Sequence, residues 1–200
     1  MTHYSNMKLF LSVIFFFVYL NHNGQVRPTR NWVDSEVKHT DSKGNSVMIT
    51  NSLPKGGNVV GKNGKQFGYR VFWTRIRNES VTPINFQVKL SDVTFFISKE
   101  SPIKIVLPKD NMRYEKIQLF DYGLTNLQSL LNDESNLLSS IQKKISPKED
   151  YFFYVTVFIQ QDSGTARAAF ILKGKDFFYK ITIGSDTLLI PFGSLNLKKQ

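Results

Sequence analysis

The stretch from residue 67 to residue 90 constrains the fold of this chain more than any other. Its first part, 67–77, places large apolar side chains on both faces of a strand, because successive side chains point to opposite sides. One face carries Phe67, Tyr69, Val71 and Trp73, and the other carries Phe72 and Ile76. A strand that is apolar on both faces is covered on both, so we expect it near the centre of a sheet.

The second part of this stretch, 84–90, alternates apolar and polar residues in the pattern of a half-buried strand. Between the two parts lie the polar residues 78–82 and Pro83, which favour a chain reversal. The stretch therefore predicts a long hairpin. A hairpin alone is not stable in water, so the remaining strands must supply a second layer.

The rest of the chain predicts further short strands separated by turn-forming residues. They lie at 47–50, 93–97, 103–107, 115–120, 151–160, 166–172, 177–183 and 188–192. Short links that contain glycine join the last four, which favours an antiparallel meander. The chain is therefore predicted to be mainly β, an antiparallel β-sandwich of immunoglobulin-like type. A small barrel is the alternative.

One helical segment is predicted to interrupt the strands. Its apolar residues recur at spacings of three, four or seven, which is typical of a helix. They are Leu124, Leu127, Leu131, Leu138, Ile141 and Ile145. The polar residues 132–135 are expected to break the segment in two, and Pro147 to end it. The sequence thus predicts one helical insertion at about 124–145, packed on the sheet.

The first 24 residues have the features of a secretory signal peptide. Lys8 precedes an apolar run of 12 residues at 9–20, and a start at Met7 instead of Met1 would retain both. The run is shorter than the roughly 20 residues that span a bilayer, so no transmembrane span is expected after signal removal. An uncleaved anchor is the alternative. We then expect an extended N-terminal segment at 25–45 and a single β-sandwich domain at 46–197.

The chain contains no cysteine, although exported animal proteins of this size commonly carry disulfides. An exported chain without cysteine is more typical of a bacterial cell envelope. We therefore expect an exported bacterial protein that resides in the periplasm, at the cell surface or in the medium.

The charge balance is basic, with 26 lysines and arginines, 16 acidic residues and a net charge of +10. A positive net charge favours acidic partners, here an acidic polysaccharide or an envelope protein. No basic run exceeds two residues, which disfavours nucleic acid. The candidate ligand-binding residues are Arg70, Arg75, Arg77, Lys62 and Lys65. Arginine binds carboxylate or phosphate, but these residues could also simply solvate the strand.

Groups for catalysis or metal binding are scarce in the sequence. His39 is the one histidine after the predicted signal peptide, so a zinc site lacks its usual ligands. The glycine-rich segment 56–63 has the spacing of a phosphate-binding loop, but Asn63 replaces the required hydroxyl residue and a strand follows. We expect a glycine-rich hairpin there, and we assign no catalytic residue, no metal and no cofactor.

These observations favour an exported, non-catalytic binding or interaction module of a bacterial cell envelope, with its ligand unknown. Two alternatives stay open. A carboxylate-dependent hydrolase acting on carbohydrate would need two carboxyl groups that converge in a cleft. A structural subunit of an envelope assembly would need an exposed apolar patch or an open edge strand.

Overall fold

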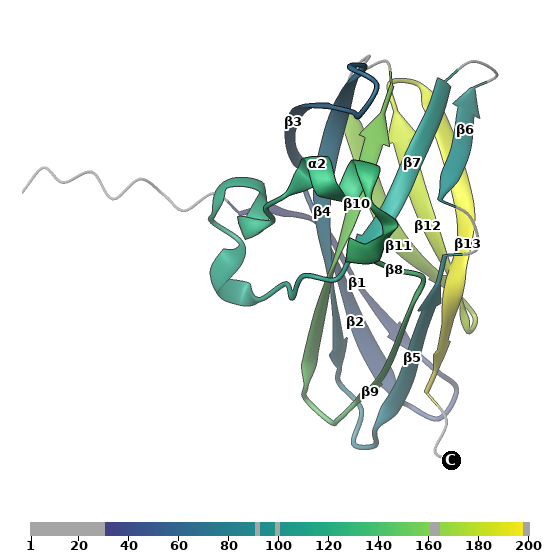
Figure 1. Cartoon of the computed structure of the whole chain (residues 1–200). Coiled ribbons are helices and arrows are strands. Elements are labelled where there is room, and N and C mark those ends of the chain that lie inside the picture. The colour runs from purple at the N-terminus through teal and green to yellow at the C-terminus, as the bar shows by residue number, and fades with distance from the viewer. Residues whose placement is uncertain (1–30, 91–92, 99–100, 161–164, 198–200) are drawn as a thin grey trace, which may run out of the picture. The chain divides into compact units, whose positions relative to one another are not determined.

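The computed structural model describes residues 31–90, 93–98, 101–160 and 165–197, and the predicted signal peptide at 1–24 lies outside them. Two antiparallel sheets pack face to face, so the predicted β-sandwich is confirmed (Figure 1). The larger sheet has the strand order β1 (Val33–Thr40), β2 (Ser46–Ser52), β4 (Gln66–Asn78), β10 (Asp150–Ile159), β7 (Ser101–Pro108), β6 (Thr94–Ser98). In it, β3 (Lys55–Val60) also pairs with β4, and β8 (Leu137–Leu138) pairs with β7.

The smaller sheet follows the order β11 (Ala166–Lys173), β12 (Asp176–Ile183), β13 (Asp186–Asn196), β5 (Ile84–Lys89), β9 (Ser140–Ile145). The first three of these strands form the predicted meander, because short turns connect them in sequence order. The preceding strand, β10, belongs to the larger sheet instead. The immunoglobulin-like type of the sandwich stays a prediction.

Strand β4 has the central position that its two apolar faces predict, since it pairs with β10 on one side and with β2 and β3 on the other. Phe72 and Ile76 point into the core between the two sheets. Tyr69 and Trp73 are buried on the opposite face, under residues 109–136. The larger sheet is therefore covered on both sides along β4.

The predicted hairpin of 67–77 with 84–90 is wrong, because β4 and β5 lie in different sheets. The polar residues between them form a corner that carries the chain from one sheet to the other. Asn78 is fully buried there, and its side-chain amide donates to the carbonyl oxygens of Thr82 at 2.8 Å and Ile145 at 3.0 Å. Its side-chain oxygen accepts from the backbone N–H of Ser80 at 2.9 Å. The apolar face of β5 instead packs against β10 across the core, where Phe86 lies 5.9 Å from Tyr151.

The core between the sheets is rich in aromatic rings, contributed by both layers. Phe86 of β5 lies 5.5 Å from Phe153 of β10, and Phe170 of β11 lies 5.2 Å from Phe153. Such centroid distances are typical of favourable edge-to-face and tilted ring pairs. The rings bind the two sheets to each other.

The helical insertion is much shorter than predicted. Only Leu127–Asn132 forms an α-helix, α2, followed by the 3-10 turn η3 at Glu134–Asn136. The second predicted helix is wrong, because residues 140–145 form strand β9. A spacing of four places Ile141 and Ile145 on one face of a helix, but equally on one face of a strand. Both residues are buried in the core between the sheets.

Two further segments differ in detail from the sequence-based expectation. The strand predicted at 115–120 is wrong, because that region contains the 3-10 turns η1 (Tyr114–Lys116) and η2 (Phe120–Gly123). Within the predicted extended segment 25–45, residues 33–40 form β1, which pairs with β2 along its length. In the part of the chain that the structure describes, no helix has the length and hydrophobicity needed to cross a membrane.

Candidate functional site

Residues 109–136, here called the covering segment, fold over the outer face of the larger sheet (Figure 1). Three tyrosines of the sheet and the segment fix it in place. Tyr69 donates to the carboxylate Oδ2 of Asp121 at 2.6 Å, and Tyr154 donates to the carbonyl oxygen of Tyr122 at 2.7 Å. Tyr122 in turn donates to the carbonyl oxygen of Leu53 at 2.6 Å. These bonds position α2 at one end of the sheet.

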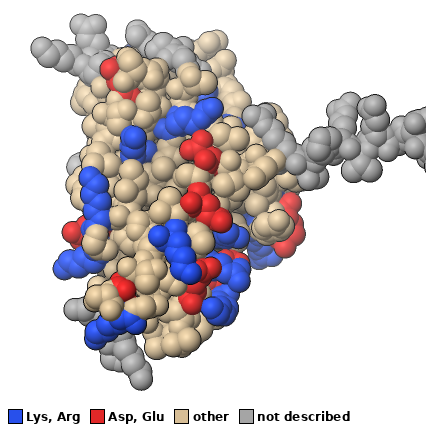
Figure 2. Space-filling view, turned by 180° about the vertical axis from the view of Figure 1, so that it is seen from behind, with Lys and Arg blue, Asp and Glu red and all other residues tan. Residues whose placement is uncertain are grey.

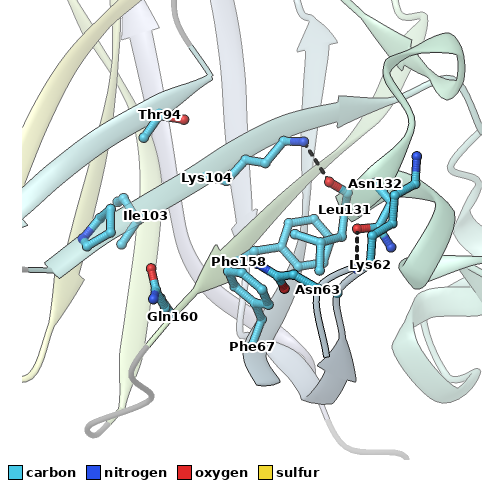
Figure 3. Close-up of a pocket in the computed structure, with 12 residues that line it drawn as sticks. Lys62, Asn63, Phe67, Thr94, Ile103, Lys104, Leu131, Asn132, Phe158 and Gln160 are labelled. Carbon is cyan, nitrogen blue, oxygen red and sulfur yellow. Dashed lines mark hydrogen bonds between the residues drawn. The ribbon is translucent and has the colours of Figure 1, made fainter. Parts of the chain in front are cut away.

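A pocket of about 370 Å³ lies where α2 meets the turn between β3 and β4. Figure 3 shows lining side chains from the turn, from α2 and from strands β4, β6, β7 and β10 of the larger sheet. The lining residues are Gly61, Lys62, Asn63, Phe67, Thr94, Pro102, Ile103, Lys104, Leu131, Asn132, Phe158 and Gln160. The volume falls at the small end of the range for ligand pockets.

Lys104 is the central polar group of this pocket. Strand pairing sets it directly opposite Phe158 of β10 on one side and opposite Thr94 of β6 on the other. Its Nζ donates to the carbonyl oxygen of Leu131 at 2.8 Å (Figure 3). Burial lowers the pKa of Lys104, although the charge of Glu134 acts in the opposite direction. An ammonium group has three donors, so donors remain for a ligand.

The remaining lining combines an apolar floor with amide and hydroxyl groups. Ile103 and Phe158 are buried, and Phe67 is half-buried beside them. Asn132 accepts a bond from the backbone N–H of Lys62 at 3.1 Å, which ties α2 to the turn. None of the described residues that line the pocket is acidic. The site is therefore suited to a small organic anion with an apolar face.

The basic residues that the sequence singles out do not gather at one place. Lys62 lines the pocket, and Lys65 is exposed in the same turn. Arg70 donates to the backbone oxygen of Tyr69 at 2.8 Å. The other two arginines lie toward the far end of β4 and form an ion-pair ladder across the sheet.

In this ladder each arginine of β4 lies close to a carboxylate of another strand in the larger sheet. Arg75 lies 3.0 Å from Glu36 of β1 and 4.0 Å from Asp150 of β10. Arg77 lies 3.3 Å from Asp150. Figure 2 shows acidic and basic side chains interspersed over the face that it draws. The ladder joins β1, β4 and β10, and its charges are already compensated.

The glycine-rich segment 56–63 forms the predicted hairpin, with β3 on one side and β4 on the other. Gly64 closes the turn in a left-handed conformation, with φ at 74°, and its N–H donates to the oxygen of Gly61 at 3.0 Å. A strand follows the turn, so no helix N-terminus faces a ligand there. Within the described ranges, no three His, Asp or Glu side chains lie close enough to hold a metal ion.

Lys104 is the site residue that the sequence interpretation missed. It interrupts the otherwise apolar run 103–107 in β7, and that interruption is the signal that could have identified it. A lysine in such a strand must leave the core, so it marks the outer face. Its neighbours Phe158 and Leu131 come from distant parts of the chain and are set only by the fold.

A second hollow, of about 420 Å³, lies over the outer face of the smaller sheet. Its lining is polar apart from Phe86, which is buried beneath it. The lining residues are Asn85, Phe86, Gln87, Gln142, Lys143, Lys144, Ser194 and Asn196. This hollow has a single apolar lining residue, whereas the pocket beside Lys104 has five, so that pocket is the better candidate site.

Compared with known proteins, the chain matches no family model, no curated protein and no solved structure.

Proposed function

We propose that this chain is an exported, non-catalytic binding module of a bacterial cell envelope. Its ligand is an acidic sugar unit of an envelope or environmental polysaccharide, held in the pocket beside Lys104. The basic charge balance of the chain and the apolar run at 9–20 support export and an acidic ligand. The described strands and turns supply the pocket.

The observation that carries this proposal is the setting of Lys104. Its ammonium group lies in a pocket lined by both polar and apolar side chains. A hydrogen bond from Nζ to the carbonyl oxygen of Leu131 fixes its position. A carboxylate placed against it would form a charge-assisted hydrogen bond in partly dehydrated surroundings. The apolar face of a sugar ring would then lie on the half-buried ring of Phe67, beside the buried Phe158.

The polar lining groups are those that orient a ligand. Thr94, Asn132 and Gln160 offer hydroxyl and amide groups around the rim. A hydrolase with paired carboxyl groups would need an acid on each side of the bound sugar. Asp150 and Glu36, by contrast, flank Arg75 in the ion-pair ladder. The geometry therefore favours binding over the hydrolase alternative.

The test is calorimetric titration of the purified exported protein with trigalacturonate, with neutral maltotriose as the control sugar. We expect saturable binding of the acidic sugar alone. Lys104→Met should weaken it by about tenfold or more, because a hydrogen bond to a charged group is lost. Lys144→Met, in the second hollow, is the matched control and should leave binding unchanged.

Three outcomes would overturn the proposal. Absence of saturable binding would remove the acidic sugar as ligand. Loss of binding in Lys144→Met, with Lys104→Met unaffected, would place the ligand on the smaller sheet. Chromatography of the titrated sample would reveal shortened sugars if the protein were instead a hydrolase. Both lysine variants should melt at the temperature of the natural protein, which separates binding from folding.

A further inference from the structure

The structure points to a second surface, distinct from the pocket. We propose that residues 113–123, here called the lobe, dock the protein onto an anionic lipid surface. The lobe contains the turns η1 and η2 and projects sideways from the sheets, in teal-green at the left of Figure 1. Tyr114, Leu119 and Phe120 expose 68%, 51% and 81% of their surfaces there. Three large apolar side chains exposed within seven residues are unusual for a surface that meets only water.

The lobe is held firmly, although its tip is exposed. The Nζ of Lys55 donates to the carbonyl oxygens of Ile117 at 2.8 Å and Leu119 at 2.7 Å. The same ammonium lies 4.1 Å from the ring centroid of Trp32 and 4.2 Å from that of Tyr122. These bonds fix the backbone on which the exposed side chains stand. Docking would therefore cost little conformational entropy.

The shape and size of the tip favour a lipid surface over a protein partner. A specific protein interface buries about 800 Å² on each partner, which takes about 20–30 residues. The lobe instead presents three large apolar side chains on a short projecting segment, and neither of the two hollows described above is lined by any of its residues. Such a projecting tip of aromatic and aliphatic side chains resembles the groups that enter the boundary between lipid headgroups and acyl chains.

The charge around the tip is compatible with an anionic surface. Lys109 and Arg113 are exposed beside it, together with Asp110 and Glu115, so the local balance is close to neutral. The net charge of the whole chain, +10, supplies attraction at longer range. Apolar insertion therefore provides most of the binding, and anionic lipid adds to it.

The chain also enters the described fold next to the lobe. Trp32 donates from its ring nitrogen to the side-chain oxygen of Gln118 at 3.2 Å, and its ring meets that of Tyr122 edge-on. These contacts tie the first described residues of the chain to the lobe.

The experiment measures sedimentation of the purified exported protein with vesicles of phosphatidylglycerol and phosphatidylethanolamine. The double variant Leu119→Ser, Phe120→Ser should lower the partition coefficient by about tenfold or more. Phe96→Ser is the matched control, because Phe96 is also exposed, at 63%, but lies on β6. It should leave partition unchanged. In Phe120→Trp, the new indole should be quenched by brominated lipid.

Several results would overturn the proposal. They are absence of partition by the natural protein, equal losses in the lobe variant and Phe96→Ser, and an indole at 120 that brominated lipid does not quench. If the lobe variant still bound vesicles but no longer bound a detergent-solubilised envelope protein, the lobe would be a site for a protein partner instead. Since none of these variants changes a residue that lines the pocket beside Lys104, failure here leaves the trigalacturonate result untouched.

Discussion

Tyr69 of the central strand donates a 2.6 Å hydrogen bond to the buried carboxylate of Asp121 in the covering segment. The other carboxylate oxygen, Oδ1, is buried without a hydrogen-bond partner among the described groups. Asp121 also has a positive φ of 46°, a conformation that Asp and Asn tolerate better than most residues. This pair joins the sheet to the segment that forms both the pocket wall and the lobe.

The Asp121 carboxyl predicts a pH-dependent stability difference for Asp121→Asn. Burial is the main reason that the pKa of Asp121 lies above its ordinary value of 3.8, while the Tyr69 bond acts in the opposite direction. Stability from this group is present below the ordinary pKa and is lost as pH rises through the raised, folded-state pKa. Asparagine keeps the acceptor for Tyr69 and does not ionise. The variant should therefore gain stability relative to the natural protein as pH rises.

Urea unfolding midpoints at a series of pH values from 4 to 7 would measure this difference. Asp110→Asn is the control, because Asp110 is exposed in the same segment. A stability difference that stays constant with pH, or that runs in the opposite direction, would contradict the role of burial at Asp121.

The buried corner at Asn78 predicts a large loss in Asn78→Ala. Truncation leaves the carbonyl oxygens of Thr82 and Ile145 and the N–H of Ser80 without their partner. Each unsatisfied buried group costs about 1–3 kcal/mol, so we expect a loss of about 3 kcal/mol or more in unfolding free energy. Asn58→Ala, on exposed β3, should change it by less than about 0.5 kcal/mol. Equal effects in urea titrations would show that the corner network does not stabilise the crossing between sheets.

The hydrogen bonds and ring contacts of the Lys55 ammonium group predict that the lobe becomes locally less stable in Lys55→Met. The variant loses two hydrogen bonds from a charged group and the contact with two rings, a cost of about 2 kcal/mol or more. Limited trypsin digestion should then cleave faster after Arg113 and Lys116, while the strands stay intact. Lys65→Met, in an exposed turn, is the control. Unchanged cleavage rates would mean that other contacts hold the lobe.

Two glycines, Gly56 on β3 and Gly44 in the turn between β1 and β2, predict a contrast between their alanine substitutions. A Cβ on Gly56 would lie 2.1 Å from the backbone oxygen of Tyr69, so Gly56→Ala must separate β3 from β4. Gly44 has a positive φ of 81° but nothing within 4 Å of an added Cβ. Gly44→Ala should therefore cost only the backbone strain of about 1–2 kcal/mol. Thermal melting should show Gly56→Ala to be clearly the less stable, and the reverse order would refute the close approach.

The lowered pKa of Lys104 predicts that the affinity for trigalacturonate falls at a lower pH than it would with a lysine of ordinary pKa. Burial is the main cause, opposed by the charge of Glu134. The ammonium form binds the carboxylate, so affinity falls as pH passes through the lowered pKa. Lys104→Arg keeps its charge and should retain affinity to higher pH. If the affinities of both proteins fall over the same pH range, another group governs binding.

The sequence predicted the central strand and the sandwich because a strand with Trp73 on one face and Phe72 on the other leaves few alternatives. It did not predict that β5 crosses to the other sheet. The alternation of apolar and polar residues shows that Phe86 is buried, but the same alternation would bury it whether β5 belonged to the larger or to the smaller sheet. In the same way, the spacing of Ile141 and Ile145 fits a helix and a strand equally, and only the pairing of β9 with β5 decides.

The candidate site could be predicted only in part. Lys62 was identified from its place beside the 67–77 strand, and it does line the pocket. Arg75 and Arg77 appeared as a basic pair because Glu36 and Asp150, which neutralise them, come from distant strands. Lys104 was visible as a lysine in an apolar strand, but its position opposite Phe158 depends on the register between β7 and β10.

A crystal structure of the protein with bound galacturonate would show where the acidic sugar lies. We expect the sugar carboxylate within hydrogen-bond distance of the Lys104 Nζ, with the ring on Phe67 in the pocket. A sugar bound on the ion-pair ladder at Arg75, or in the hollow at Lys144, would contradict it. So would a pocket that stays empty at saturating galacturonate.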